Sequence, residues 1–305
     1  MKFIEANSTG FTSGAQVGAF KGAVKDLSNN KYHSLKKYFS SSELKNLYAT
    51  SPAHFKYDRD EQLKSGEGKK QTYDMILGSL VHCLILTPDR YEKEFFVMPD
   101  LNFRTNEGKA AREEILAANI GKTPINDEML IQANEMRSSA LSNSKVNELL
   151  APGIKEASYF WSCPFSNLNF KAQLDHSSSQ HFCELKTTGK CGAKESAWSA
   201  HMFNMNYDLS LFHYREGLKH TMLVEPPAYF IVIERDAPYV TQIYKVSEAT
   251  WETGREKWLS AVSKLERGFK ENIWPGYFPT NEIPEISPPA WGIKQVMPVG
   301  DFGGI

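Results

Sequence analysis

The sequence lacks the features that mark several common protein classes. Its four cysteines, at positions 83, 163, 183 and 191, form no C-x-x-C pair, so the spacing of zinc ribbons and iron–sulfur sites is absent. It has no apolar run of the ~20 residues that span a membrane and no secretory signal at its start. We therefore expect reduced thiols in a cytoplasmic protein.

Net charge is also nearly absent, at −1, which argues against a non-specific polycation. The average conceals an asymmetry, because residues 1–70 hold 12 Lys/Arg and 7 Asp/Glu, whereas the rest hold 23 and 29. A basic segment beside an acidic one suits a polyanion bound near a metal-binding cluster. Ordinary surface charge explains the same counts.

The sequence does contain a series of helical segments in its first half. We expect an irregular arm over 1–31, a polar loop over 58–71, and helices over 40–52, 73–91, 104–119 and 127–150. The 73–91 segment is apolar nearly all round, which indicates a buried helix. His82 is the polar side chain in its middle.

From residue 156 the pattern changes to short, aromatic-rich segments with alternating apolar residues, which is typical of strands. We expect strands at 156–165, 168–176, 181–188, 228–235 and 239–246, and helices at 193–204, 207–220 and 247–270. No internal repeat or low-complexity linker interrupts the chain, so one α/β domain is the simplest interpretation.

Three charged residues of two neighbouring strands are predicted to meet. Side chains alternate between the faces of a strand, so the 168–176 strand presents Asp175 on its polar face. Glu184 and Lys186 share a face of the next strand. If the two strands form a hairpin, Asp175 lies near both of them, although an ordinary cross-strand ion pair fits the same spacing.

Two carboxylates and an ammonium on one face also suit a hard divalent cation. Mg²⁺ takes oxygen ligands and is commonly held by one or two carboxylates together with substrate phosphates. The backbone carbonyl of Leu185 could add a ligand. Lys186 could orient or deprotonate the attacking water, or neutralise charge on the phosphate.

Several stretches resemble the RecE-type (exonuclease VIII) phage and prophage exonucleases of the PD-(D/E)XK nuclease superfamily, which are related to lambda exonuclease and RecB nuclease domains. They are SSSELKNLYATSPAHFKY (40–57), LGSLVHCLILTPDRYEKEFFV (77–97), FKAQLDH with CELKTT (170–188), YDLSLFHYREGLK (207–219), WPGY (274–277) and PPAWG (288–292). The resemblance implies an α/β restriction-endonuclease-like core, a central mixed β-sheet flanked by helices, over residues 32–292. Residues 1–31 would form an N-terminal arm and 293–305 a C-terminal tail.

The resemblance also implies roles for individual residues. His82, Asp175 and Glu184 match the metal ligands of the family, and Lys186 matches its catalytic lysine. Glu156 falls where the family often has a further acid near the metals. The implied cofactor is Mg²⁺, with Mn²⁺ as a substitute and two ions in each active site.

One motif departs from the family pattern. YDLSLFHY keeps Tyr207 and Tyr214 but has Ser210 where the family usually has Gln. Ser210 and Tyr214 form an i, i+4 pair on one helix face, so both are candidates for the catalytic site. The short serine reaches such a site only through a water. We expect activity to persist, with a lowered rate or an altered end preference.

The segment around residue 40 suits a DNA end. Ser41 and Ser42 begin a helix whose free amides favour anions. Lys36, Lys37 and Lys45 lie close by in the sequence. A terminal 5′-phosphate could bind there, and a plain helix cap with solvated lysines explains the same residues.

The implied function is a Mg²⁺-dependent 5′-to-3′ exodeoxyribonuclease that acts on linear double-stranded DNA ends and leaves 3′ single-stranded tails for recombination by strand annealing. The family implies a homo-oligomeric ring (trimer or tetramer), a RecT/Red-beta-like single-strand annealing protein as partner, and the cytoplasm of a bacterial host of a phage or prophage.

Two alternatives remain. An endonuclease or a single-strand nuclease of the same fold is one, and the missing cysteine cluster counts against the CRISPR-associated type of the latter. A catalytically weak DNA-binding recombination scaffold is the other, and Ser210 is its main support. The clustered carboxylates count against the scaffold.

Overall fold

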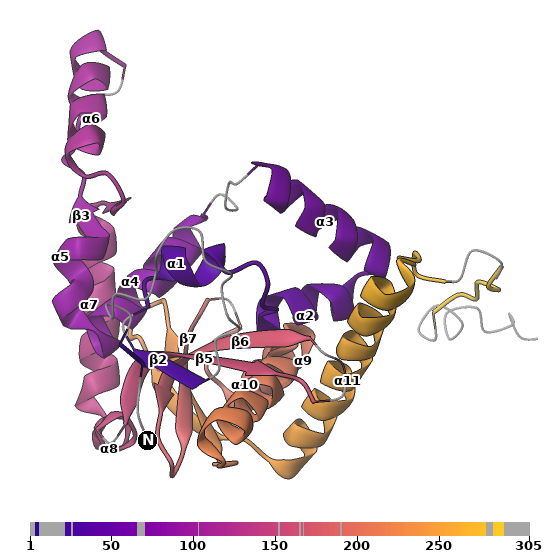
Figure 1. Cartoon of the computed structure of the whole chain (residues 1–305). Helices are drawn as coiled ribbons and strands as arrows, with labels where there is room; N and C mark the ends of the chain where they lie inside the picture. Colours follow the sequence, from indigo (N-terminus) through magenta and orange to yellow (C-terminus); the bar gives the residue numbers. More distant parts are fainter. Residues whose placement is uncertain are drawn as a thin grey trace, which may run out of the picture.

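A seven-stranded mixed β-sheet forms the centre of the molecule, in the order β1-β2-β5-β6-β7-β8-β9 (Figure 1). The computed structural model describes residues 4–5, 22–25, 27–65, 71–102, 104–151, 153–164, 166, 168–189, 191–278 and 283–289. The strands of the sheet are β1 (Ile4–Glu5), β2 (Gly22–Lys25), β5 (Ile154–Ser162), β6 (Asn169–Ser177), β7 (Phe182–Thr188), β8 (Ala228–Glu234) and β9 (Thr241–Lys245).

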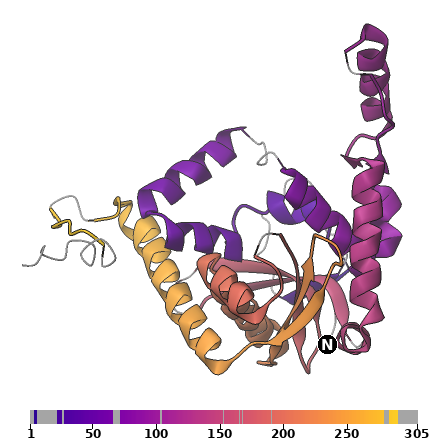
Figure 2. The ribbon, with the colours of Figure 1, turned by 180° about the vertical axis from the view of Figure 1, so that it is seen from behind.

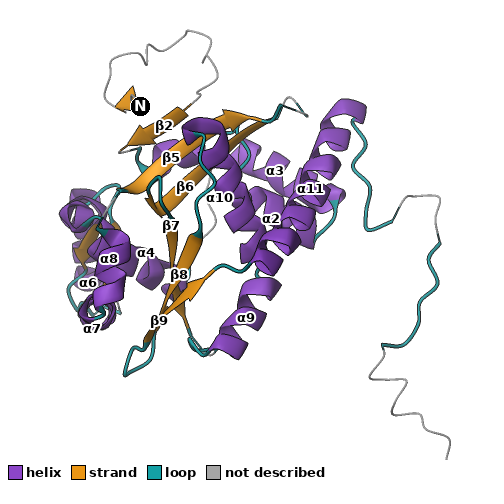
Figure 3. Ribbon diagram, turned by 90° about the horizontal axis from the view of Figure 1, so that it is seen from below, coloured by secondary structure: helices purple, strands orange, loops and turns teal. Residues whose placement is uncertain are grey.

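Helices cover both faces of this sheet, as the view in Figure 3 shows. One layer comprises α2 (Ser41–Ala49), α3 (Pro52–Ser65), α9 (Glu195–Asn204), α10 (Tyr207–Met222) and α11 (Glu248–Glu271). The other comprises α4 (Tyr73–Leu86), α7 (Asp127–Ser142) and α8 (Ser144–Leu150). Successive side chains of β7 point to opposite faces of the sheet and so pack in two separate cores. Phe182 packs with the first layer of helices and Leu185 with the second.

The pairing of the strands sets the position of the charged residues. β6 runs antiparallel to β5 along its whole length, but it pairs with β7 only at His176↔Cys183 and Ser177↔Phe182. β7 then pairs with β8 in parallel, which requires the crossover through α9 and α10. The carboxyl half of β7 is thus held by β8, beyond the last paired residues of β6.

A smaller part of the chain lies outside this central body. β3 (Phe95–Val97) and β4 (Thr123–Ile125) form a short parallel pair, and α6 (Asn106–Ala118), between them in the sequence, projects away from the sheet (Figures 1 and 2). The remaining elements are short: α1 (Asn29–Ser34), the 3₁₀ turn η1 (Pro88–Arg90) and α5 (Tyr91–Glu94).

The mixed sheet flanked by helices confirms the predicted fold class, and each expected strand is present. The polar loop expected over 58–71 is wrong in its first part, because α3 extends to residue 65. Pro52, expected to stop one helix, instead begins the next, where a missing N–H costs nothing. The expected helix over 127–150 is broken at Asn143. Residues 66–70, and most of the arm and tail, lie outside the described residues.

Within the part of the chain that the structure describes, no helix is both long enough and apolar enough to cross a membrane.

Candidate metal centre

Asp175, Glu184 and Lys186 meet where β6 and β7 separate. The Lys186 ammonium lies 2.8 Å from Glu184 Oε2 and 3.8 Å from Asp175 Oδ2. The side chains of Asp175 and Glu184 are 14% and 5% exposed, so both carboxylates are largely withdrawn from water. The structure therefore brings together the three residues that the alternation of the strands predicted to be neighbours.

The backbone of Leu185 fixes this arrangement. Its amide donates a hydrogen bond of 2.7 Å to Asp175 Oδ2, and its carbonyl accepts one of 3.0 Å from the Lys186 ammonium. The Leu185 carbonyl, a predicted metal ligand, therefore faces the cluster but is engaged by Lys186. Its side chain is buried in the opposite direction, in the core under α4.

His82 and Glu156 complete the cluster from two other elements. His82 Nδ1, from the middle of α4, lies 3.3 Å from Asp175 Oδ1. One ligand atom each from His82, Glu156 and Asp175 lies within 4.8 Å of the others, so these three can hold one metal ion. The one histidine of the apolar helix thus points into the site.

Glu156 adopts an uncommon backbone conformation in the middle of β5. Its φ is +53°, in the left-handed region that side chains other than glycine rarely adopt. The residues on either side pair with β6 at Lys155↔His176 and Ala157↔Leu174, so Glu156 lies opposite Asp175. Such strain persists where surrounding structure holds it and is concentrated at functional sites. We attribute it to the placement of the Glu156 carboxylate.

The five titratable groups of the cluster affect one another. Burial raises the pKa of Asp175, but the charges of His82 and Lys186 outweigh it and hold that pKa well below its usual range. Burial and the Asp175 charge raise the pKa of Glu184 and of Glu156. Burial lowers the pKa of Lys186, but Glu184 and Asp175 reverse this and raise it, so Lys186 remains a cation.

These groups fit a divalent cation. Glu184 Oε1 is buried and has no hydrogen-bond partner among the described residues, which is costly for a carboxylate oxygen unless a cation binds it. The positive charges nearby do not fully neutralise the carboxylates of Asp175 and Glu156. Carboxylate oxygens with one imidazole can hold Mg²⁺ or Mn²⁺.

A second group of residues borders the cluster from α2 and α10. Lys45 lies 4.8 Å and Lys186 5.7 Å from the centre of the Tyr207 ring. Burial and the charge of Lys186 lower the pKa of Lys45 to about 8. Ser41 Oγ donates to the Tyr214 hydroxyl over 3.3 Å. Burial raises the pKa of Tyr214, and the nearby charge of Glu184 raises it further.

The remaining sequence candidates are not brought to the cluster by a described contact. Ser210 is buried, and its hydroxyl has no partner among the described residues. Ser42, Lys36 and Lys37 are exposed.

The amino end of α2 is also already occupied by a carboxylate. Glu43 accepts from the Ser40 amide over 2.9 Å in a capping box, and it pairs with Arg59. An anion at this helix end would meet the Glu43 charge, so the predicted phosphate site at the helix end is not favoured. Ser41 and Lys45 remain available on the side of α2 that borders the cluster.

Two contacts were missed in the sequence. One is the approach of the Lys45 and Lys186 ammonium groups to the Tyr207 ring. Tyr207 and Tyr214 are seven residues apart, so these two tyrosines lie on one face of the helix. The capping box was readable from Ser40-x-x-Glu43. The approach of Lys45 to Tyr207 joins residues far apart in the sequence, and no local pattern indicates it.

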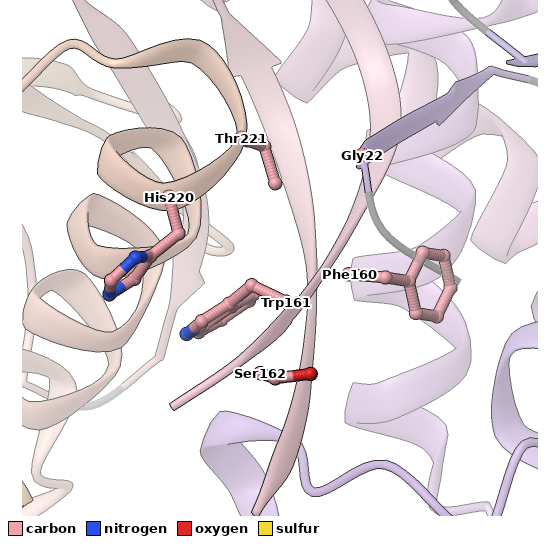
Figure 4. Close-up of a pocket in the computed structure, with 6 residues that line it drawn as sticks. All are labelled: Gly22, Phe160, Trp161, Ser162, His220 and Thr221. Carbon is pink, nitrogen blue, oxygen red and sulfur yellow. The ribbon is translucent and has the colours of Figure 1, made fainter. Parts of the chain in front are cut away.

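A hollow of about 330 Å³ lies elsewhere, between β5 and the end of α10 (Figure 4). It is lined by Gly22, Phe160, Trp161, Ser162, His220 and Thr221. None of these described lining residues is a carboxylate or a predicted site residue. Its chemistry is unrelated to the cluster.

Comparison with known proteins supports the fold. A family model described as a PDDEXK-like domain of unknown function (DUF3799) matches residues 40–283. The chain is similar to a crystal structure of a "Putative exonuclease" from Eubacterium rectale, with a TM-score of 0.58 and 12% identity over 89% of this chain and 99% of that one. At that identity the likeness shows the fold alone. No curated protein matches the chain significantly.

The conformation of Glu156 gives a prediction about stability. In EDTA, we expect Glu156→Gly to raise the free energy of unfolding by about 1 kcal/mol, because glycine adopts a positive φ without strain and a buried carboxylate is removed. Urea denaturation measures this. In Mn²⁺ the wild type should gain stability and the variant should gain less.

The matched control is Lys155→Gly, at the preceding exposed position of the same strand. Here glycine should cost about 0.5–1 kcal/mol, because the backbone is extended. Equal destabilisation by both substitutions in EDTA would contradict the assignment of strain to Glu156.

Proposed function

Because the chain belongs to the PDDEXK-like family DUF3799, we propose that it is a Mg²⁺-dependent exodeoxyribonuclease acting on the ends of linear double-stranded DNA. The observation that carries the proposal is the convergence of Asp175 and Glu184 on the Lys186 ammonium, which lies within 4 Å of an oxygen of each carboxylate at the separation of β6 and β7. Two carboxylates and a lysine at that point are the residues that phosphodiester hydrolysis with a metal requires.

Asp175, Glu184, His82 and Glu156 would hold the metal. When bound, Mg²⁺ polarises the phosphodiester and makes a bound water more acidic. The metal would also neutralise the mutual repulsion that raises the pKa of Glu184 and Glu156.

Lys186 would act as a positive charge and hydrogen-bond donor. Its pKa is raised by Glu184 and Asp175, so it carries its proton and is poorly suited to remove one from water. It lies at the edge of the carboxylate cluster, where it can orient the water or stabilise the negative charge that develops on the phosphate. This role differs from general-base catalysis and needs no deprotonated lysine.

Lys45, with Ser41 and Tyr214, would contact a DNA phosphate. Lys45 is a partly buried cation on the same side as Lys186, and Ser41 and Tyr214 offer hydroxyls beside it. A terminal 5′-phosphate bound there would lie next to the carboxylate cluster. Lys36, Lys37 and Ser42 would lie along the path of the DNA outside the site, since they are exposed.

The finer features rest on the resemblance to RecE-type exonucleases. We propose that the enzyme degrades the 5′ strand, leaves a 3′ tail and uses two Mg²⁺ per site. It would form a trimeric or tetrameric ring around DNA and supply a RecT/Red-beta-like single-strand annealing protein in the bacterial cytoplasm. One nuclease domain would extend over 32–292, with 293–305 as a tail and with 1–31 as an arm whose described strands, β1 and β2, extend the central sheet.

Substitution of Lys186 tests the catalytic proposal. With Mg²⁺, we expect Lys186→Ala to lower the rate on end-labelled linear duplex at least ~100-fold, because a preorganised charge next to the phosphate is removed. Binding of the same duplex in Ca²⁺ should change little. Lys155→Ala, an exposed lysine of β5, is the control and should keep its rate.

Nicked and closed circles, incubated in parallel with the linear duplex, separate the alternatives. Exonuclease activity requires cleavage of the linear duplex, no cleavage of closed circles, and loss of cleavage in EDTA. Cleavage of closed circles would indicate an endonuclease. An absence of cleavage of all substrates at every metal concentration would indicate a DNA-binding scaffold.

Removal of the Lys45 charge tests the phosphate site. We expect Lys45→Gln to reduce the preference for 5′-phosphate over 5′-hydroxyl ends, measured as the ratio of kcat/KM on the two duplexes. Lys37→Gln should leave this ratio nearly unchanged. Because the pKa of Lys45 is about 8, the preference of the wild type should decline as the pH rises past 8, where the free enzyme loses the charge. An unchanged ratio in Lys45→Gln would remove Lys45 from the site.

A further inference from the structure

A second cluster of metal-ligating side chains lies beside the carboxylates, at the closed end of the β6–β7 hairpin. One ligand atom each from His176, His181 and Cys183 lies within 4.8 Å of the others. We propose that these three residues bind a thiophilic transition-metal cation, with Zn²⁺ as the representative, at a site distinct from the carboxylate centre.

The hairpin itself positions the three ligands. His176 and Cys183 are directly opposite each other in the antiparallel pair of β6 and β7, so both side chains leave the sheet on one face. His181 precedes β7, and its ring stacks on that of His176 with the centroids 5.3 Å apart and the planes at 24°. The arrangement therefore depends on strand register, which is strongly specified where a face of the sheet is buried.

The site is enclosed. His176 is 0% and Cys183 1% exposed, and His181 is half-buried. Gly153 closes one side, because a Cβ there would lie 2.7 Å from His176 Nε2 and 2.4 Å from the Ser177 carbonyl oxygen. Access to the three side chains is therefore restricted to the side of His181.

A backbone carbonyl orients His181 as it would orient a ligand. His181 Nε2 lies 2.8 Å from the Leu149 carbonyl oxygen, at the end of α8. Because a carbonyl only accepts, Nε2 carries the proton and Nδ1 keeps its lone pair. Histidines that bind metals usually donate their other ring N–H to such a carbonyl, which fixes the tautomer and the ring orientation.

The donor set selects the class of cation. A thiolate with two imidazoles favours Zn²⁺, Co²⁺ or Cu⁺ and disfavours Mg²⁺, which takes oxygen ligands. Zn–S and Zn–N bonds of about 2.3 and 2.0 Å place the ligand atoms about 3.3–3.6 Å apart in a tetrahedron, so side-chain rotation need draw them together by about 1.5 Å at most. On binding, the Cys183 thiol proton passes to solvent as the sulfur–metal bond forms, and water fills the fourth position.

A cation here would stabilise the strands that carry the carboxylates. His176 follows Asp175 and Cys183 precedes Glu184, so the bound metal would cross-link β6 and β7 one residue away from each carboxylate. This consequence for the carboxylate centre rests on the proposed function, whereas binding of the metal does not. The two proposals can therefore fail separately.

Cobalt spectroscopy on the untagged full-length chain tests the site, with residual metal removed beforehand. We expect Co²⁺ to produce a thiolate-to-metal charge-transfer band in the near ultraviolet at one equivalent, and Zn²⁺ to abolish it by displacement. The band requires a sulfur ligand, so Cys183→Ser should remove it. Cys163→Ser, a buried cysteine of the other core, and Asp175→Asn should both retain it.

Stability measurements keep the test valid if Cys183→Ser folds poorly. The half-exposed His181→Gln retains a donor for the Leu149 carbonyl, and we expect its Co²⁺ affinity to fall at least ~10-fold. Zn²⁺ should raise the Tm of the wild type and leave that of His181→Gln nearly unchanged. No band in the wild type, a band retained in Cys183→Ser, or equal affinity in His181→Gln would each overturn the proposal and leave the three residues as packed core side chains.

Discussion

The hydrogen bond from the Leu185 amide to the Asp175 carboxylate is the contact on which the site depends. β6 and β7 share only two paired positions, and beyond them no ladder holds the strands together. The Asp175 side chain replaces the missing backbone pairing and brings its own charge to the residues that follow Leu185. An amide donor also favours the ionised carboxylate, so the same contact ties the strands and keeps Asp175 charged.

The cluster is electrostatically unbalanced without a cation. Three carboxylates approach one another, and Lys186 and His82 neutralise only part of the charge, so burial and repulsion raise the pKa of Glu184 and Glu156. A buried oxygen of Glu184 remains unbonded among the described residues. A stable protein core would avoid such an arrangement, because uncompensated buried charge is costly. The backbone strain at Glu156 also supports a functional site, because the residue that adopts the rare conformation contributes its carboxylate to the cluster.

Much of this structure could be predicted from the sequence, because its apolar residues recur with the periods of strands and helices. The alternation in β6 and β7 placed Asp175 beside Glu184 and Lys186, whereas the role of His82 followed only from the resemblance to a nuclease family. Features set by tertiary contact could not be predicted. The left-handed conformation of Glu156 and the approach of Lys45 to Tyr207 have no local signal. The meeting of His176 with Cys183 follows from the same hairpin that placed Asp175 beside Glu184, and it was missed. α3 was missed because its charged residues, solvated on a helix surface, have the composition of a loop.

The central claim is that Asp175 and Glu184 share a divalent cation. Anomalous scattering from crystals soaked in Mn²⁺ measures this directly. The account predicts a peak at about 2.1 Å from an oxygen of each carboxylate, with His82 or Glu156 completing the coordination. No peak between the two carboxylates at saturating Mn²⁺, with Glu184 still bonded to Lys186 alone, would contradict it.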